Sequence, residues 1–398
     1  MNRLLARIGN PHTQVLAIHI AGTNGKGSVT AMLHSILLSA GYTAGMYTSP
    51  HLVDICERIR VNNERISQQE FADLVTELRP AIRELQCTFF EAMTAIAMYY
   101  FAEKQVDVAL YEVGLGGRLD ATNVVTPELS IITNIDFDHT QHLGQTLAAI
   151  AEEKAGIIKN GVPCVVGPMP QEAREKIMAI ARAKESPCYA YEQFCTGEQH
   201  SVTIDGTSFT AKMKSFGTQH IHLPLIGQHQ AANSCVAVAS ALILRQKGWN
   251  IDAEQIVRGL ESVQWPGRFD VISRDPVIVL DVAHNARSVQ HLCTNLQTLF
   301  SGLKKTVLFA VLQDKDYGSM IDRLGAVAYR FYVVPINSPR ALPPQRLEKE
   351  IIKRGYKVSS FSSVGEAIKT FLRVRQDDEM LCVTGSHYIV GDVMAMER

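Results

Sequence analysis

The sequence predicts an α/β protein built around parallel sheets. Short runs rich in β-branched residues alternate with longer segments of helical spacing, an alternation typical of parallel strands connected by helices. Because the strand-like runs are apolar throughout, we expect sheets that are covered on both faces. In the first two thirds of the chain the expected strands are "VLAIHI" (15–20), "VALYEV" (108–113), "LSIITNI" (129–135) and "PCVVG" (163–167).

Helices are expected between these strands. Their apolar residues recur with helical spacing, and they cover 28–40, 90–104, 146–154 and 171–184. A polar stretch, "SVTIDGTSFTAKM" (201–213), interrupts the pattern and predicts a hairpin that turns at Asp205-Gly206. A further helix is expected at 231–246.

A domain boundary is predicted at "SVQWPGRFDVI" (262–272), where proline and glycine interrupt both periods. A second alternation follows, with strands expected at 277–282, 306–312, 330–336 and 380–385. We therefore predict a first domain at 1–263, a hinge linker at 264–268 and a smaller second domain at 269–398. A crevice between two such domains is a usual place for a small-molecule site.

The composition excludes several classes of protein. The chain has 398 residues, of which 46% are hydrophobic and 20% charged, as in ordinary soluble globular proteins. A formal net charge of −1 gives no overall attraction to nucleic acid or to a membrane surface, so neither is expected as a partner. Eight cysteines without a C-x-x-C pair, no signal peptide and no apolar run of about 20 residues predict a reduced, cytoplasmic protein without zinc.

The stretch "HIAGTNGKGSVTAML" (19–33) has the glycine-rich sequence of a phosphate-binding loop between a strand and a helix. Glycines at such a turn let backbone N–H groups close on phosphate oxygens, and the helix N-terminus adds a positive dipole end. Lys26 is expected at the outer phosphates and Ser28 at a magnesium ion, although Gly27 separates them, unlike the usual G-x-x-x-x-G-K-[ST] pattern. The alternative is a glycine-rich turn that binds nothing.

The stretch "YEVGLGGRLDATNVV" (111–125) is the second candidate. Glu112 stands at the carboxyl end of an expected strand, where open α/β sheets bind ligands. The glycines that follow allow a close approach of the backbone, and Arg118 and Asp120 come directly after them. We expect a functional loop here, whereas Glu112 alone is equally typical of a structural partner.

The third candidate begins at Asp136 and Asp138, which follow another strand. His139 should therefore lie in the same crevice as Glu112. On the next expected helix, Lys154 falls on an apolar stripe that contains positions 147, 150, 151 and 158, and the glutamates at 152 and 153 point away.

A buried ammonium group is costly unless it is paired or neutralised. Lys154 is therefore expected either to reach the surface at the helix end or to work beside a metal ion. In the second case the lysine could be carbamylated by CO₂, because the resulting anion suits a site with two magnesium ions.

Two polar clusters follow strands of the second domain. "VLDVAHNARS" (279–288) places Asp281, His284 and Asn285 just past one strand, and "TGSHYIVGD" (384–392) places Ser386 and His387 after the last. Each could be ordinary loop polarity, but their position at strand ends favours a functional role.

Taken together, the motifs resemble the Mur ligase superfamily, and specifically its folylpolyglutamate synthase / dihydrofolate synthase branch. The resemblance runs in order from about residue 10 to residue 392 and includes "AGTNGKGS", "GMYTSPHL", "ERIRVN", "FEAMTAIAMYYF", "EVGLGGRLDATNVV", "DHTQHLG", "EKAGIIK", "WPGRFDV", "DVAHN" and "TGSHYIVG". It implies a P-loop-containing parallel-sheet ATPase domain followed by a smaller Rossmann-like α/β glutamate-ligase domain. It also implies an enzyme in which ATP phosphorylates a carboxylate and an amine then attacks the acyl phosphate.

The resemblance implies roles for single residues. The phosphate loop would comprise Asn24, Gly25, Lys26, Gly27 and Ser28, while Ser49, Glu112 and His139 would hold magnesium and Lys154 would be carbamylated. Asn233, Arg268 and Asp281 would contact the nucleotide, Thr88 and Phe89 the folate, and His284 and Ser386 the glutamate. Among these, Lys26, Lys154 and His284 would be catalytic.

The cofactors and partners follow from the same resemblance. ATP, two magnesium ions and a monovalent cation would serve the reaction, and the substrates would be a folate, or a related carboxylic acid, and L-glutamate. The enzyme is expected to act as a monomer without nucleic acid or membrane partners.

The sequence departs from the family pattern at three places. Val282 and Ala286 replace a glycine and a proline around the family's "AHN" element, and Asp54 to Cys56 replace a basic and polar stretch near the substrate loop. Relatives also carry further residues ahead of the helix expected at about Arg3, in a segment that helps to bind dihydropteroate in the bifunctional enzymes. This departure favours glutamate addition over dihydrofolate synthesis, or a paralogue that uses another acid.

Three functions are therefore open at this point. The first is an ATP-dependent ligase that adds L-glutamate to a folate, with or without dihydropteroate as a second substrate. The second is a paralogue that joins a different carboxylic acid to an amino acid. The third is a non-catalytic nucleotide-binding protein, against which the intact set of Lys26, Ser28, Glu112, His139 and Lys154 argues.

Overall fold

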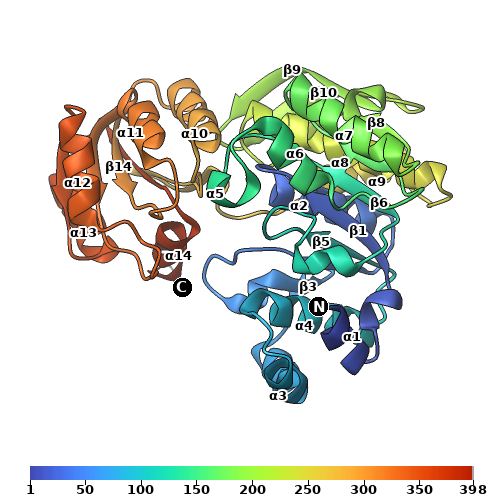
Figure 1. Ribbon diagram of the computed structural model, residues 1–398. Helices are drawn as coiled ribbons and strands as arrows, with labels where there is room; N and C mark the ends of the chain where they lie inside the picture. Colours follow the sequence, from blue (N-terminus) through green and yellow to red (C-terminus); the bar gives the residue numbers. More distant parts are fainter. Residues whose placement is uncertain (397–398) are drawn as a thin grey trace. The chain divides into compact units, whose positions relative to one another are not determined.

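The computed structural model describes residues 1–396 and divides the chain into two compact units (Figure 1). The first contains Met1–Ser201, Thr207–Pro224 and Gln228–Gln264. The second contains Val202–Gly206, Leu225–Gly227 and the chain from Trp265 onward. The two short segments of the second unit have no counterpart in the sequence pattern. Ile226 belongs to its apolar core, and Val202 and Ile204 pack against that core, which explains the assignment.

The first unit is built on an eight-stranded sheet of order β4-β3-β2-β5-β1-β6-β7-β8. From β2 to β8 the neighbouring strands are parallel, and only β3 and β4 are antiparallel additions at one edge. The strands are β1 Leu16–Ala21, β2 Ala44–Tyr47, β3 Ile59–Val61, β4 Glu64–Arg65, β5 Val108–Glu112, β6 Leu129–Ile132, β7 Cys164–Val166 and β8 Cys188–Ala190. The four strands predicted here are confirmed as β1, β5, β6 and β7.

Helices cover this sheet on both faces, as Figure 1 shows. They are α1 Asn2–Arg7, α2 Lys26–Ser39, α3 Gln68–Glu84, α4 Phe89–Glu103, α5 Thr140–Leu143, α6 Leu147–Ala155, α7 Gln171–Ala183, α8 Gln228–Gln246 and α9 Ala253–Glu261. Helix α2 packs against β1, α8 and α9, so most of its residues are buried. Short 3₁₀ turns lie at Pro11–Thr13, Ile55–Arg58, Ala121–Val124 and Tyr191–Gln193.

A separate three-stranded antiparallel sheet has the order β11-β10-β9. Its strands are β9 Cys195–Thr203, β10 Gly206–Met213 and β11 Gly217–Leu223. The predicted hairpin is present, but its turn is one residue earlier than expected, because Ile204 and Asp205 form the turn and Gly206 already begins β10. The third strand was not anticipated.

The second unit has a six-stranded sheet of order β12-β13-β17-β14-β15-β16. All neighbours are parallel except β12 and β13. The strands are β12 Asp270–Arg274, β13 Val277–Leu280, β14 Lys304–Phe309, β15 Ala328–Val333, β16 Val358–Ser360 and β17 Glu379–Thr384. The helices are α10 Ala286–Leu299, α11 Tyr317–Gly325, α12 Pro344–Lys353, α13 Val364–Val374 and α14 His387–Met396. The four predicted strands are confirmed as β13, β14, β15 and β17.

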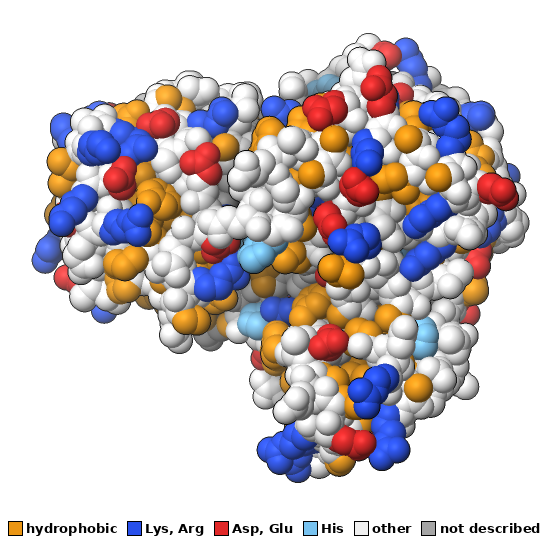
Figure 2. Space-filling model, in the orientation of Figure 1, with side chains coloured by type: hydrophobic (Ala, Val, Ile, Leu, Met, Phe, Trp, Pro, Cys, Tyr) orange, Lys and Arg blue, Asp and Glu red, His pale blue; other side chains and the backbone are white. Residues whose placement is uncertain are grey.

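The surface carries mixed charge. On the face shown in Figure 2, Lys and Arg side chains are interspersed with Asp and Glu on each unit. Within residues 1–396, no helix combines the length and the apolar character that crossing a bilayer requires.

Candidate active site

The glycine-rich loop between β1 and α2 has the geometry of an anion cradle. Gly25 caps the start of α2 with φ +79°, a left-handed conformation that glycine adopts without strain. A Cβ atom at Gly25 would lie 2.6 Å from Oδ1 of Asn233, and one at Gly22 would lie 1.9 Å from Oγ1 of Thr133. Both positions therefore require glycine, and the fourteen-residue helix α2 presents its N-terminal N–H groups beside them.

The segment after β6 holds this loop in place. The Asn24 N–H donates to Oδ1 of Asn134 at 2.7 Å, and Oγ1 of Thr133 donates to the Asn24 carbonyl at 2.7 Å. The hydroxyl of Thr23 donates to the Asp136 carbonyl at 3.1 Å and accepts from the Asp136 N–H at 3.0 Å. Sequence reasoning did not single out Thr133 or Asn134, because a polar residue after a strand carries no specific signal.

Two lysines meet at the carbonyl oxygen of Gly22. Nζ of Lys26 donates to this oxygen at 3.1 Å and Nζ of Lys154 donates to it at 2.9 Å. Lys26 also donates to the Thr23 carbonyl at 3.2 Å. The structure thus brings the two predicted catalytic lysines together beside the loop.

Lys154 is buried, with 5% of its surface exposed, on the inner face of α6. Ile150 and Ala151 share this face and Glu152 is exposed, as the sequence predicts. The predicted stripe extends too far, because α6 ends at Ala155 and Ile158 is buried beyond the helix. Since the ammonium group ends on a buried carbonyl, the alternative of a side chain that reaches the surface is wrong.

The glycine-rich loop after β5 positions the C-terminal turn of α6. A Cβ atom at Gly117 would lie 2.8 Å from the carbonyl oxygens of both Glu153 and Lys154. The Arg118 N–H donates to the Glu153 carbonyl at 2.8 Å, and its guanidinium pairs with the Glu153 carboxylate at 2.7 Å. The loop and the backbone of Lys154 are therefore in direct contact.

Ser49 and Glu112 lie side by side at the carboxyl ends of neighbouring strands. Glu112 ends β5, is 4% exposed and accepts a hydrogen bond from the Ser49 N–H at 3.1 Å. His139 follows β6, which is separated from β5 by β1. Its backbone N–H donates to the Asp138 carboxylate at 2.8 Å, and its Nε2 lies 3.8 Å from the same group.

The chemistry of this set suits a hard cation. A buried carboxylate, the Ser49 hydroxyl and the buried Ser28 hydroxyl are oxygen donors of the kind that Mg²⁺ prefers. Within residues 1–396, no three His, Cys, Asp or Glu side chains are arranged to hold a metal ion. Because Mg²⁺ keeps several water or phosphate ligands, a site with one or two protein carboxylate or hydroxyl groups is sufficient.

Asp120 shapes the loop that follows Glu112. Its carboxylate accepts from the N–H groups of Gly114 at 3.0 Å and Leu115 at 2.9 Å, and from the Thr122 hydroxyl at 2.5 Å. Burial raises the pKa of Asp120 above its ordinary value, and the hydrogen bonds oppose this shift. The Thr122 hydroxyl also contacts Nε2 of His19 at 2.8 Å, and burial lowers the pKa of this histidine to about 3.

Thr88 and Phe89 begin α4 at the surface. Thr88 caps the helix by accepting from the Glu91 N–H at 3.2 Å, and 58% of Phe89 is exposed. The guanidinium of Arg58 lies 5.4 Å from the centre of the Phe89 ring. An exposed ring with a cation over it can stack on a planar substrate.

Asn233 projects from α8 toward the phosphate loop. Its Nδ2 donates to Oε1 of Gln230 at 3.0 Å, and its Oδ1 is the atom that a Cβ at Gly25 would strike. The structure therefore places this predicted nucleotide contact directly beside the loop.

In the second unit, Asp281 follows β13. Its carboxylate accepts from the Phe269 N–H at 2.9 Å and the Ala283 N–H at 2.7 Å. Burial raises the pKa of Asp281 to about 6, and the positive charge of Arg268 opposes the shift. Arg268 and Asp281, predicted from separate motifs, are thus close enough to interact.

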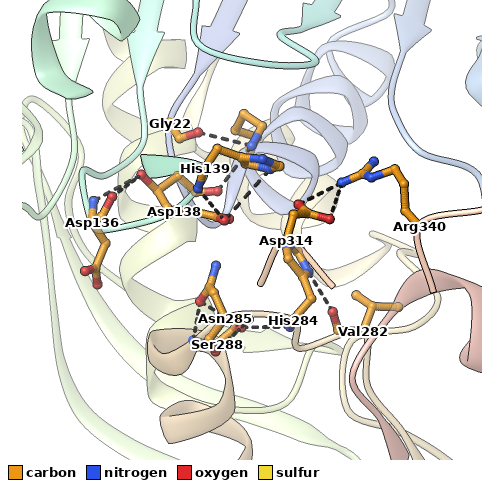
Figure 3. A network of polar contacts seen from close by, with 12 residues as sticks. Gly22, Asp136, Asp138, His139, Val282, His284, Asn285, Ser288, Asp314 and Arg340 are labelled. Carbon is orange, nitrogen blue, oxygen red and sulfur yellow. Dashed lines mark hydrogen bonds and ion pairs between the residues drawn. The ribbon is translucent and has the colours of Figure 1, made fainter. Parts of the chain in front are cut away.

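His284 and Ser386 also lie at this end of the second sheet. Nδ1 of His284 is 2.9 Å from the Val282 carbonyl, so Nδ1 carries the proton of the neutral ring and Nε2 is the acceptor (Figure 3). The ring centre of His387 lies 5.4 Å away from that of His284. Ser386 is buried, and its hydroxyl accepts from the Ile389 N–H at 3.4 Å.

Family models match both units. The Mur ligase middle domain matches residues 20–241 and the Mur ligase glutamate ligase domain matches residues 267–387. The chain is 36% identical over 407 residues to the dihydrofolate synthase/folylpolyglutamate synthase of Bacillus subtilis, covering 99% of this chain and 93% of that protein. It is 35% identical to the folylpolyglutamate synthase of Lacticaseibacillus casei, covering 98% and 92%.

Solved structures agree with this relationship. A Mycobacterium tuberculosis folylpolyglutamate synthase complexed with ADP superposes with a TM-score of 0.94 at 29% identity, covering 99% of this chain and 93% of that one. An E. coli FolC structure in complex with DHPP and ADP gives a TM-score of 0.88 at 32% identity, covering 99% and 91%. The chain therefore belongs to the Mur ligase family, and within it to the folylpolyglutamate synthase and dihydrofolate synthase branch.

Proposed function

We propose that this chain, an ATP-dependent ligase, adds L-glutamate to a folate through an acyl phosphate. A substrate carboxylate attacks the γ-phosphorus of ATP and releases ADP, and the amine of glutamate then displaces phosphate to form the amide. The observation that carries the proposal is the meeting of Lys26 and Lys154 at the Gly22 carbonyl, beside the start of α2. The relatives that are named folylpolyglutamate and dihydrofolate synthases support it.

The phosphate loop binds the nucleotide in this proposal. Asn24 to Ser28 surround the phosphates, with the N-terminal N–H groups of α2 as donors, and the Lys26 ammonium neutralises charge that develops on the transferred phosphoryl group. Asn233, beside Gly25, contacts the adenine. Arg268 and Asp281, in the second unit, are the further proposed nucleotide-binding residues.

Ser49, Glu112 and His139 are the proposed protein ligands for magnesium. When bound, magnesium neutralises the phosphate oxygens and orients the transferred group. The proposal extends to two magnesium ions and a monovalent cation, for which the oxygen-rich strand ends of the first sheet are the available donors.

Lys154 is proposed to be carbamylated. The ammonium first loses a proton to solvent, the neutral amine then attacks CO₂ to form a C–N bond, and a second proton leaves, so the buried cation becomes an anion. The change removes the repulsion between two ammonium groups that share the Gly22 carbonyl. It also adds oxygen donors near a cation site.

The substrates are proposed to lie against different residues. Thr88 and the exposed ring of Phe89 contact the folate, whereas His284 and Ser386 contact glutamate, with His284 as the catalytic residue on that side. Dihydropteroate is proposed as a second acid substrate.

The enzyme is proposed to act as a monomer, which sedimentation equilibrium tests.

One experiment tests the function. The protein is incubated with MgATP and L-glutamate, and tetrahydrofolate, dihydropteroate or no pterin is supplied in parallel. Phosphate release and the mass of the product are followed. We expect phosphate release that depends on the pterin and a product that carries one additional glutamyl group.

Two variants serve as matched controls. Lys26→Gln should lose activity by at least ~100-fold, because it removes a charge that contacts the transferred group. Lys176→Gln should retain it, because Lys176 only forms an exposed pair with Glu152. Absence of turnover with every pterin, together with turnover of another carboxylic acid, would replace the folate assignment by the paralogue.

A further inference from the structure

Polar residues follow the carboxyl ends of the parallel strands in the second sheet, and the proposed function assigns a role to only some of them. The parallel strands β13, β17, β14 and β15 are neighbours, so their carboxyl ends lie along one edge. His284 follows β13 and Ser386 follows β17. Asp314 follows β14 and Arg340 follows β15, and neither has a role so far. Ligands of open α/β sheets bind at this edge.

Arg340 and Asp314 form a close ion pair (Figure 3). Nη2 of Arg340 lies 2.8 Å from both carboxylate oxygens of Asp314. The Arg340 side chain is 52% exposed and that of Asp314 is 24% exposed. Burial opposes ionisation of Asp314, but the hydrogen bond and charge of Arg340 hold the pKa of Asp314 below its ordinary value.

The pair leaves part of the guanidinium available. Asp314 contacts only Nη2, and Nε and Nη1 of Arg340 make no hydrogen bond to any of residues 1–396. Nε and Nη1 lie on either side of Nη2, and their N–H groups can each donate a hydrogen bond to an oxygen of a ligand carboxylate. Asp314 therefore orients the guanidinium through Nη2 and leaves its other donors for a ligand.

The backbone beneath Arg340 is fixed. Its carbonyl accepts from the Gln313 N–H at 2.9 Å, and its N–H donates to Oγ of Ser338 at 3.3 Å. Leu312 and Ala341 form a β-bridge, which joins the loops that carry Asp314 and Arg340. A binding group whose backbone and charge partner are both held loses little freedom when a ligand binds.

We propose that Arg340 is a substrate-binding residue that holds a carboxylate, with Asp314 as its positioning residue. The inference rests on the proposed function, because L-glutamate and the glutamyl tail of a folate are the carboxylates that this reaction brings to the enzyme. The ligand class is an α-amino dicarboxylate or a glutamyl tail. The two sources are separated by measuring which substrate loses affinity.

The test measures KM and kcat for Arg340→Gln and Arg340→Lys in the full chain. Glutamate is varied in one series, and folates with one or several glutamyl groups are varied in the other. We expect Arg340→Gln to raise the KM of one carboxylate source ~10- to 100-fold, with kcat changed by less than about threefold. Arg340→Lys should give a smaller increase, because it keeps the positive charge but loses the planar guanidinium and its several donors.

Arg274→Gln is the matched control. Arg274 forms the same kind of exposed pair, with Asp205 at 2.6 Å, but it pairs in register with Val277 at the start of β13, on the opposite edge of the sheet. Its loss should leave both KM values unchanged. Asp314→Asn should raise the same KM as Arg340→Gln by a smaller factor and leave kcat unaltered, which a merely structural role would not produce.

The outcomes are distinct. A higher KM for glutamate identifies the amino acid as the ligand, and a higher KM for folates with longer tails identifies the tail. Unchanged KM values in folded Arg340→Gln, with wild-type activity present, overturn this inference and leave the proposed function intact. If Arg340→Gln fails to fold by circular dichroism, Arg340→Lys decides by the same criterion. Absence of wild-type activity refutes the proposed function first.

Discussion

The amino group of Lys154 shares the carbonyl oxygen of Gly22 with Lys26, at distances of 2.9 and 3.1 Å. Two ammonium groups that bind one acceptor repel each other, and burial of Lys154 strengthens the repulsion because water screens it poorly. A lysine at this buried position is costly in free energy, which supports the proposed role of Lys154 in the reaction.

Lys154→Ala is expected to lower activity by at least ~100-fold, because the proposed carbamate and its negative charge are lost. Short-chain carboxylates such as formate or acetate should restore part of the activity, since they can occupy the vacated space. Steady-state rates with and without added carboxylate check this. Lys159→Ala is the control, because Lys159 binds Asn123 and lies outside the proposed site. Near-normal rates in Lys154→Ala would exclude the carbamate.

Asp281 gives a prediction about protonation. Burial raises its pKa from 3.8 to about 6, and Arg268 limits the shift. The folded state binds this proton more tightly than the unfolded state, so the associated stability is fully present below pH 3.8 and is lost as pH rises through about 6. Carboxyl ¹³C NMR should show an aspartate with an apparent pKa near 6 that is absent in Asp281→Asn. Arg268→Gln should raise this pKa further, and a wild-type value near 4 would contradict the account.

At the scale of elements, the loop after β5 links the metal-ligand candidate Glu112 to α6. At the beginning of this loop, the Asp120 carboxylate accepts hydrogen bonds from the N–H groups of Gly114 and Leu115. Further along the loop, Gly117 packs on the last turn of α6. Lys154 is therefore positioned by an element distant in sequence. The position of its side chain depends on the absence of a Cβ atom at Gly117.

Gly117→Ala tests this packing. The added methyl would lie 2.8 Å from two backbone carbonyl oxygens, so α6 or the loop must shift, at a cost of about 1–3 kcal/mol. We expect kcat/KM to fall ~10-fold or more, because small displacements of positioning groups are costly in catalysis. Gly302→Ala, where nothing lies within 4 Å, should leave stability and rate unchanged. Full activity in Gly117→Ala would show that Lys154 is not positioned by this contact.

At the scale of the whole molecule, the apolar cores lie within separate compact units. One core cluster lies around β14 and β15 in the second unit, and two others lie in the first unit on the sheet of β1 and β5. Proteins with several such cores commonly depart from two-state unfolding. The phosphate loop belongs to the first unit, so nucleotide binding is expected to stabilise at least that unit.

Differential scanning calorimetry tests this expectation. MgADP at about 100 times its dissociation constant should add about 2.7 kcal/mol to the free energy of unfolding of the unit that binds it. The transition of the first unit should therefore move to higher temperature. Lys26→Gln should abolish or reduce the shift without changing the nucleotide-free thermogram. A thermogram that MgADP does not alter would contradict nucleotide binding by the phosphate loop.

The sequence predicted the elements that carry a strong local signal. Mostly apolar runs identified β1, β5 and β14 to within a few residues, because a strand buried on both faces has few polar positions. The short strands β2, β8 and β16 were not predicted, since three or four residues do not establish a period. The end of α6, predicted at residue 154, lies at Ala155, whereas the predicted apolar stripe extends beyond the helix to Ile158.

The sequence alone determined the α/β class, the family and the motif residues of the phosphate loop. Each of these depends on residues that are close together in the chain, so it can be recognised without the fold. Only the tertiary structure decided that Lys154 meets Lys26 at Gly22, and that Gly25 lies against Asn233. It also paired Arg340 with Asp314, two residues from separate loops without a motif. Such contacts join segments far apart in the chain, so only packing of the sheets and helices can bring them together.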